Sequence, residues 1–411
     1  MRHRLPPALK LRSFAFLWVS SLANGLALQM LVVAIGLQVY VIHHDPLDLG
    51  LVGLAEFVPL PLLVLPAGYI ADRLPRRRVV AAGLAVQVGI ALGLVAITLD
   101  GAHTLWPFLA IGATAGVASA VTNPAGRSLT PEIVGAELLP GAIALRSVAN
   151  QAGIVVGPAI GGIVFKFSPT AVYVTAASLF ALAVVTTLAI TTPHAIARPR
   201  TELNWESLSA GIGFIVRTKM LLGAISLDLV SVLLGDSIVL APVFALSILH
   251  TGPIGVGLLR AAPSVGALTA GLLLARRPLP YRAGPTLLGV VAAFGAMMIV
   301  FGLSRSLPLS LAALAVSGFA DMISMNIRAT AVLLVTPPEL QGRVGAVEWV
   351  FISASNELGA FESGAVASLV GTVAAVVAGG AVMIGVAGSW RRLFPSLARM
   401  GRLDELRLEP V

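Results

Sequence analysis

The amino-acid sequence predicts an all-α integral membrane protein with twelve transmembrane helices, arranged as two six-helix bundles in parallel repeat. The first observation is composition: 57% of the 411 residues are hydrophobic and only 11% are charged, whereas soluble domains contain about 25% charged residues. The second is a succession of long apolar segments along the whole chain. The third is the position of the basic residues, which gather between alternate apolar segments.

Twelve apolar segments are long enough to cross a membrane, because about 20 apolar residues span the hydrocarbon core of a bilayer. They are residues 13–42, 49–71, 79–99, 104–122, 141–166, 169–191, 220–249, 254–275, 285–303, 308–332, 344–370 and 371–389. The first follows a basic stretch, but its length and the similar segments after it indicate a retained helix rather than a secretory signal. Only Gly371 separates the last two segments.

The basic residues predict the orientation of the chain, because cytoplasmic loops carry the excess of Lys and Arg. With both termini in the cytoplasm, 24 of the 27 basic residues fall in cytoplasmic segments. Arg328 and Arg343 are counted among them, near the end of the tenth segment and the start of the eleventh. We therefore expect a multi-pass protein of the bacterial inner (plasma) membrane with both termini cytoplasmic.

The longest polar interval, residues 193–219, divides the segments into two groups of six. We expect an N-terminal bundle at residues 1–192, a cytoplasmic linker at 193–219 with a short surface helix, a C-terminal bundle at 220–390 and a cytoplasmic tail at 391–411.

The two halves also share residues at a constant offset of 206 positions. This offset pairs Asn150 with Asn356 and Gly153 with Gly359. Because each half has an even number of helices, both copies insert in the same orientation, which gives parallel repeats.

Several classes of function are excluded or disfavoured by what the chain lacks. It has no cysteine, so it cannot form disulfides or thiolate metal sites. No lysine follows a glycine, so the Gly-Lys-Ser/Thr phosphate loop is absent. No nucleophile–base or metal-ligand spacing is visible, so we expect no enzyme, no metal and no cofactor. The net charge is +8, but these charges flank membrane segments, which argues against nucleic acid as a partner.

The loop after the second apolar segment carries the sequence Gly68-x-x-x-Asp72-Arg73-x-Pro75-Arg76. It resembles the loop signature between helices 2 and 3 of the major facilitator superfamily of transporters, with Pro75 where that family usually has glycine. The resemblance covers nearly the whole chain. It implies the major facilitator fold and a cytoplasmic gate in which Asp72 pairs with Arg73 and Arg76. A charge cluster that only sets topology is the alternative.

The fifth apolar segment contains a glycine-rich pattern, formed by Gly153, Gly157, Pro158, Gly161 and Gly162. It resembles the superfamily motif of drug–proton antiporters, which implies export. The alternative is ordinary close packing, because small residues at this spacing let two helix backbones touch. Together with residues 258–263 and 355–364, this pattern resembles the enterobactin-exporter and macrolide-efflux branch.

Ionisable residues within the apolar segments are costly, at about 2.5–3.5 kcal/mol each at the bilayer centre. They should therefore face a cavity or one another. Burial in an apolar environment favours the protonated form of a carboxylic acid, as proton coupling requires. The candidates for proton coupling are Asp236, Glu357, Asp321 and Glu56. A fixed ion pair of Arg260 with Asp236 or Glu56 is the alternative.

In the superfamily, helices 1, 4, 7 and 10 line the substrate cavity. The resemblance assigns the cavity's polar residues as Asn24, Gln29, Asp228, Asp236, Asp321 and Asn326. The fourth segment lacks the membrane-embedded arginine that is common in drug–proton antiporters, because Arg127 lies at its end. The usual proton route of that group is thus not expected here.

We expect a monomeric secondary active transporter that exports a small, partly apolar molecule, a drug or a siderophore, by proton antiport through alternating access. Its partners would be this substrate, protons and the lipid bilayer. An importer or facilitator on the same fold is one alternative. A membrane sensor that moves no solute is the other.

Overall fold

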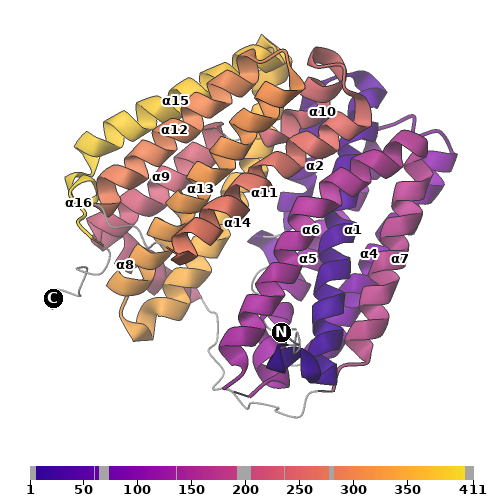
Figure 1. Ribbon diagram of the computed structural model, residues 1–411, viewed down its shortest axis with the longest axis horizontal. Helices are drawn as coiled ribbons and strands as arrows, with labels where there is room; N and C mark the ends of the chain where they lie inside the picture. The colour runs from indigo at the N-terminus through magenta and orange to yellow at the C-terminus, as the bar shows by residue number, and fades with distance from the viewer. Residues whose placement is uncertain are drawn as a thin grey trace. The chain divides into compact units, whose positions relative to one another are not determined.

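The structure is a computed structural model that describes residues 6–59, 61–63, 74–135, 137–191, 205–235, 237–276 and 282–402. Every regular element in this part of the chain is a helix (Figure 1). Four residues expected to be functional, Gly68, Asp72, Arg73 and Asp236, lie outside the described residues.

The chain divides into two compact units. Unit 1 comprises residues 1–43, 55–201 and 252–261, and unit 2 comprises residues 44–54, 202–251 and 262–411. Each unit therefore contains one short segment from the opposite half of the sequence. At the offset of 206, residues 44–54 correspond to 250–260, so the two exchanged segments are equivalent parts of the repeat.

The helices of unit 1 come mainly from the first half of the chain. They are η1 (Pro7–Lys10), α1 (Arg12–His43), α4 (Arg76–Leu99), α5 (Trp106–Ile133), α6 (Leu139–Phe167) and α7 (Pro169–Leu188). Two further helices, α2 (Pro46–Phe57) and α11 (Gly252–Arg276), begin in one unit and end in the other.

The other helices of unit 2 begin within the expected linker. They are α8 (Trp205–Arg217), α9 (Lys219–Gly235), η2 (Ile238–Leu240), α10 (Ala241–Val243), η3 (Phe244–Ile248), α12 (Ala283–Leu303), α13 (Leu307–Val335), α14 (Pro338–Val370), α15 (Thr372–Leu393) and α16 (Pro395–Ala398). The expected surface helix is α8, which packs on α14 through Ile215, Val344 and Val347.

Eleven helices among the described residues are long and apolar enough to cross a membrane. The twelfth expected span lies in α14, whose 33 residues exceed the length of a bilayer crossing. It falls outside the eleven because its apolar residues are interrupted by charged ones, among them Arg343, Glu348, Glu357 and Glu362. The all-helical membrane fold is confirmed, and α14 is its most polar long helix.

Gly371 ends α14 and begins α15, as expected from its isolation between two apolar runs. Its backbone angles are φ 90° and ψ 146°, a conformation that is essentially restricted to glycine. One residue is therefore enough to reverse the chain between two long helices.

The structure corrects the expected end of the fourth span. We expected the helix to stop at residue 122, before Asn123-Pro124, but α5 continues to Ile133. Its last turns are held by packing, since Leu129 and Ile133 are buried. Arg146 of α6 also donates hydrogen bonds to the Gly126 carbonyl (2.7 Å) and to Thr130 Oγ1 (2.9 Å). Tertiary contacts thus outweigh the helix-breaking tendency of proline.

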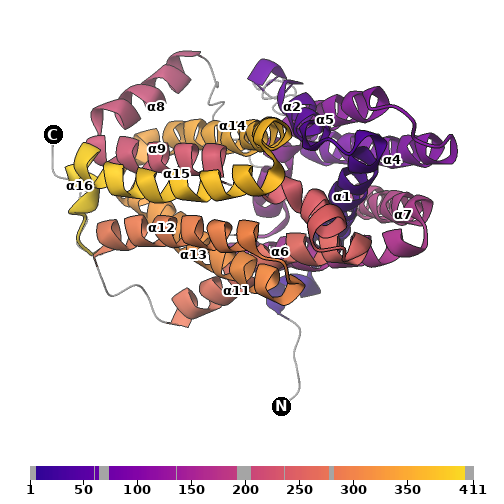
Figure 2. The ribbon, with the colours of Figure 1, turned by 90° about the horizontal axis from the view of Figure 1, so that it is seen from above.

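In unit 1, α1 is the central helix and packs on both α6 and α7 (Figure 1). Ser20 of α1 bonds Thr187 Oγ1 of α7 at 2.8 Å, and Tyr173 of α7 donates to Gln38 of α1 at 2.5 Å. In unit 2, α12 and α15 lie side by side along their length, which both views show (Figures 1 and 2).

Equivalent helix contacts recur in the two units. A methyl group added at Gly153 of α6 would lie 2.7 Å from the carbonyl carbon of Gly25 on α1. The same addition at Gly359 of α14 would lie 2.8 Å from the Val232 carbonyl oxygen on α9. Adding 206 to 25 gives 231, so the contacts match to within one residue. This supports the duplication expected from the sequence.

Candidate functional site

Three charged side chains from three helices meet inside unit 2. Arg328 of α13 donates from Nη1 to Oδ2 of Asp228 on α9. The two side chains are only 9% and 12% exposed. Glu348 of α14 borders the same small pocket and interacts electrostatically with both partners. We call these three residues the charged cluster.

The helix boundaries explain why these residues meet. Asp228 lies nine residues after the start of α9, Arg328 seven residues before the end of α13, and Glu348 ten residues after the start of α14. At 1.5 Å per residue, the three lie about 10–15 Å from those helix ends. If these ends are all on one side of the membrane, the side chains share one depth.

Two sequence interpretations are corrected here. Arg328 was counted among the charges of the cytoplasmic segments, although the expected span 308–332 contains it; it lies within α13, which continues to Val335, and only 8% of the residue is exposed. Glu348 was expected only one turn into its helix, because the apolar run starts at residue 344. In fact α14 begins at Pro338, since its polar first turns pack on α8 and carry the helix outward.

The charge balance of the cluster is its main chemical property. With both carboxylates ionised, its net charge is −1, and one bound proton brings it to zero. A net charge in an apolar interior is costly. The cluster therefore has two carboxylates for one guanidinium, and its second carboxylate, on the half-buried Glu348, has no cation of its own within the cluster.

A cavity of about 100 Å³ adjoins the cluster within unit 2. Asp228 borders both spaces, and the cavity wall also includes Asp321, Ser324 and Asn356. This volume holds several water molecules. Two of the expected cavity residues, Asp228 and Asp321, are thus brought together, and Asp321 is exposed.

The other expected residues of unit 2 lie elsewhere on the same helices. Glu357 of α14 faces the first turns of α2, where a methyl group added at Gly53 would lie 3.3 Å from Glu357 Oε2. Asn326 of α13 is half-buried.

The expected residues of unit 1 are distributed over three helices. Glu56 of α2 lies at a close contact with α5, where a methyl group on Gly116 would meet the Glu56 carbonyl oxygen at 2.1 Å. Gln29 of α1 lies against Gly157 of α6, and Asn24 of α1 is half-buried. Arg260 lies on the part of α11 that belongs to unit 1.

The glycine pattern of α6 serves close helix packing. A methyl group at Gly157 would lie 2.7 Å from Gln29 Cβ, and one at Gly161 would lie 3.1 Å from Met30 Cα, both on α1. Gly162 instead faces α11, where a methyl group would lie 2.5 Å from the Pro253 carbonyl oxygen. The bend-permitting Pro158 is buried within the same helix.

Arg76, expected as a gate residue with Asp72, has a different partner among the described residues. Its Nη1 donates to Glu132 Oε1 of α5 at 2.7 Å, and the two side chains are 19% and 15% exposed. Next to it, Arg77 donates to the Ile190 carbonyl oxygen at the end of α7. These contacts tie α4 to α5 and α7 at their basic end.

Apolar helices in two repeated units, one of which contains a buried ion pair, define a polytopic helical membrane protein, and its fold is that of the major facilitators. Solved structures support this fold. A bacterial homologue of the human lysosomal transporter Spinster, in an inward-facing and unoccupied conformation, matches with a TM-score of 0.75 and 14% identity, covering 98% of this chain and 99% of that one. A bacterial homologue of the iron transporter ferroportin matches with a TM-score of 0.70 and 16% identity, covering 92% and 98%.

The chain belongs to the family described as transmembrane secretion effector, whose model matches residues 5–404. It is similar to the enterobactin exporter EntS of Citrobacter koseri, with 27% identity over 390 residues, 91% of this chain and 90% of that one. The EntS protein of Shigella boydii is 26% identical over 382 residues, with 90% and 88% coverage. The chain is thus a secondary transporter of the bacterial inner membrane and not an enzyme, in the superfamily branch that its motifs indicated.

Proposed function

We propose that this protein exports a siderophore in exchange for protons, by alternating access of one substrate site to the two sides of the membrane. The direction and the substrate class follow from the similarity to proteins named enterobactin exporters over about nine-tenths of the chain. The proton coupling rests on one structural observation, the charged cluster of Asp228, Arg328 and Glu348.

The cluster supports coupling because one arginine can balance only one of its two carboxylates. In the protonated state the cluster is neutral, and in the deprotonated state the second carboxylate carries an excess charge. The protonated and deprotonated states of the cluster differ by one charge. If two conformations of the protein bury the cluster to different extents, binding of a proton favours the conformation that buries it more. The adjoining cavity, with Asp321 and Asn356 in its wall, gives protons and water a place next to Asp228.

We further propose a monomer with both termini in the cytoplasm. In this orientation the ion pair Arg76–Glu132 lies at the cytoplasmic end of unit 1. The remaining expected residues keep their proposed roles: Asp236, Asp321, Glu357 and Glu56 as further proton carriers, and Asn24, Gln29 and Asn326 as substrate contacts. Gly68, Asp72 and Arg73 remain proposed gate residues together with Arg76.

The test is transport by the purified protein in proteoliposomes, with enterobactin as the substrate and an imposed pH gradient. Wild type should accumulate enterobactin only when the gradient is present. Glu348→Gln removes the second carboxylate and keeps the ion pair, so binding should survive while gradient-driven accumulation falls at least tenfold. Glu339→Gln is the matched control, because Glu339 is exposed in the first turn of the same helix.

Accumulation by Glu348→Gln at the wild-type rate would refute the role of the cluster. Failure of wild type to move enterobactin, together with gradient-driven movement of a macrolide, would replace the siderophore with a drug as substrate. Downhill movement that ignores the pH gradient would favour a facilitator.

A further inference from the structure

An open groove of about 880 Å³ runs between α12 and α15 at the end of unit 2 where α12 begins and α15 ends. Its floor and walls are apolar near the middle of the helices, with Leu288, Ala292 and Ile384 among the lining residues. Three arginines line it: Arg282, Arg391 and Arg399. The groove is separate from the charged cluster and shares no residue with it.

Two glycines keep the groove open. Gly289 of α12 and Gly388 of α15 both line it, and an added methyl group at either one would contact no atom within 4 Å. The two helices pack tightly elsewhere, because a methyl group at Gly295 would lie 2.6 Å from the Gly380 carbonyl oxygen. The helices therefore touch at their middle, and the space between them opens toward the end that carries the arginines.

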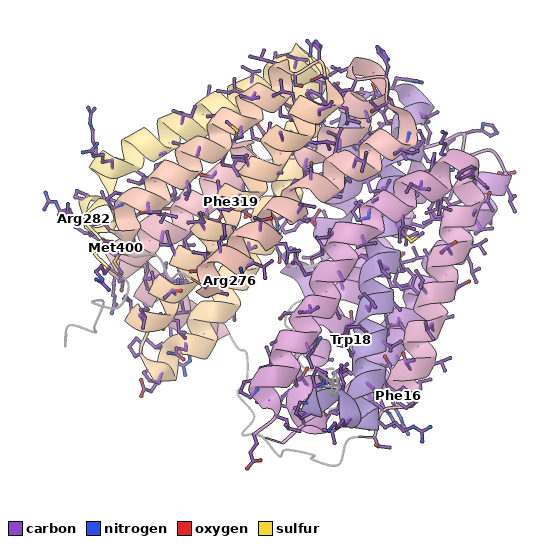
Figure 3. All side chains as sticks on the ribbon, in the orientation of Figure 1. Phe16, Trp18, Arg276, Arg282, Phe319 and Met400 are labelled. Atoms are coloured by element: carbon purple, nitrogen blue, oxygen red, sulfur yellow. The ribbon has the colours of Figure 1, made fainter. Side chains whose placement is uncertain are left out.

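The arginines are held at the rim by well-anchored backbone. Arg282 directly precedes α12, and Arg391 is in the last turn of α15. Arg399 follows α16, and the next residues accept hydrogen bonds from the start of α12: Met400 from the Gly284 N–H (3.1 Å) and Gly401 from the Ala283 N–H (2.8 Å). Figure 3 shows Arg282 beside Met400 at this end of unit 2.

These arginines differ in environment from those in the ion pairs. All three are exposed, and within the described part of the chain none of their side chains has a hydrogen bond or an ion pair with an acidic group. Three positive charges around one opening, without a counter-charge among the residues that the structure describes, match an anion. Guanidinium groups bind phosphate oxygens through paired hydrogen bonds.

The dimensions match one leaflet of a membrane. From Arg282 to Ala292 there are ten residues, or about 15 Å of helix, which is about half of the 30 Å hydrocarbon core. Ile384 lies seven residues, or about 10 Å, from Arg391. A ligand that fills this groove therefore has an anionic head at the membrane surface and an apolar chain that extends inward.

We propose that the groove is a binding site for an anionic phospholipid of the surrounding leaflet, with its phosphate between Arg282, Arg391 and Arg399 and an acyl chain along α12 and α15. Basic pockets between membrane helices are a known means of recognising anionic lipid head groups. A free phosphate ion would bind the arginines but would leave the apolar walls uncovered. The arginine-lined rim and the apolar walls together therefore favour a lipid.

The test measures binding of dioctanoyl phosphatidylglycerol to the full-length protein in detergent by native mass spectrometry, with dioctanoyl phosphatidylcholine as the neutral comparison. Wild type should retain phosphatidylglycerol in preference to phosphatidylcholine. Arg391→Gln and Arg399→Gln should each weaken its binding about fivefold. Gly388→Leu should weaken binding at least as much, because its side chain enters the open space that Gly388 leaves beside α12 while all three arginines remain.

Matched controls exist on the same helix. Arg392→Gln changes the neighbouring exposed arginine, which does not line the groove, and Gly385→Leu adds a side chain at another position with open space. Both should bind like wild type. The proposal is overturned if Arg391→Gln and Gly388→Leu bind like wild type, if both lipids bind equally, or if equimolar inorganic phosphate displaces the lipid. If Gly388→Leu does not fold, the comparison of phosphatidylglycerol binding by Arg391→Gln and Arg399→Gln with binding by Arg392→Gln decides the result.

Discussion

Removal of the arginine from the charged cluster should destabilise the protein, and removal of its aspartate partner should restore part of the loss. In Arg328→Gln, Asp228 loses its cation and stays buried, because its side chain is only 12% exposed. In the double variant Arg328→Gln/Asp228→Asn, neither ionic partner remains. Asn has the same size and shape as Asp, whereas Gln is shorter than Arg.

The expected magnitude follows from the burial of this pair. Breaking a buried ion pair by removing one partner costs about 3–5 kcal/mol, because a charge stays buried and uncompensated. For a unit of about 200 residues, each kcal/mol lowers the unfolding midpoint by about 2–4 °C. Arg328→Gln should therefore unfold at least about 6 °C below wild type. The double variant should recover about half or more of this difference in unfolding midpoint. The remaining loss is expected because Glu348 also no longer has the positive charge of Arg328 nearby.

The assay is thermal unfolding of purified wild type, both single variants and the double variant in one detergent, analysed as a double-mutant cycle. Arg343→Gln is the control, because Arg343 is exposed on α14 and its substitution should change stability by about 0.5 kcal/mol or less. If the effects of the two single substitutions simply add, the buried pair does not contribute as described, and the reasoning about the cluster fails.

Two further predictions concern glycines. Gly153→Ala should lower the free energy of unfolding by about 1–3 kcal/mol, because its methyl group would overlap Gly25 of α1. Gly141→Ala, at an open position of the same helix, should instead raise the free energy of unfolding by about 0.5–1 kcal/mol. Equal effects of the two substitutions would contradict the packing role of α6. Gly371→Ala should cost about 1–3 kcal/mol, measured as a lower unfolding midpoint, since φ at this position is 90°; an unchanged midpoint would show that the turn between α14 and α15 does not need glycine.

The sequence predicted the fold well where apolar runs and helices coincide. The expected spans at residues 13–42 and 141–166 correspond closely to α1 (Arg12–His43) and α6 (Leu139–Phe167). The prediction fell short at α5, which continues past the expected end at residue 122 to Ile133. Hydrophobicity marks the part of a helix that lies in lipid, whereas α5 and α14 continue beyond it through contacts with neighbouring helices.

The charged cluster was only partly predictable for the same reason. Asp228 was named because a carboxylate inside an apolar run is costly. Arg328 and Glu348 lie near the ends of their apolar runs, so Arg328 was counted with the cytoplasmic charges and Glu348 was placed near the membrane interface. The depth of a side chain depends on where its helix ends, and the apolar pattern did not define those ends. A search for opposite charges at equal depth on adjacent helices would have found the pair.

The most direct test of the account is whether substrate movement and proton movement are coupled. Everted membrane vesicles that contain the protein are energised so that their interior becomes acidic, and enterobactin is added while an internal dye reports pH. With proton antiport, enterobactin should make the interior less acidic with wild type and with Glu339→Gln, but not with Glu348→Gln. Enterobactin uptake by wild type without any change of internal pH would contradict proton antiport.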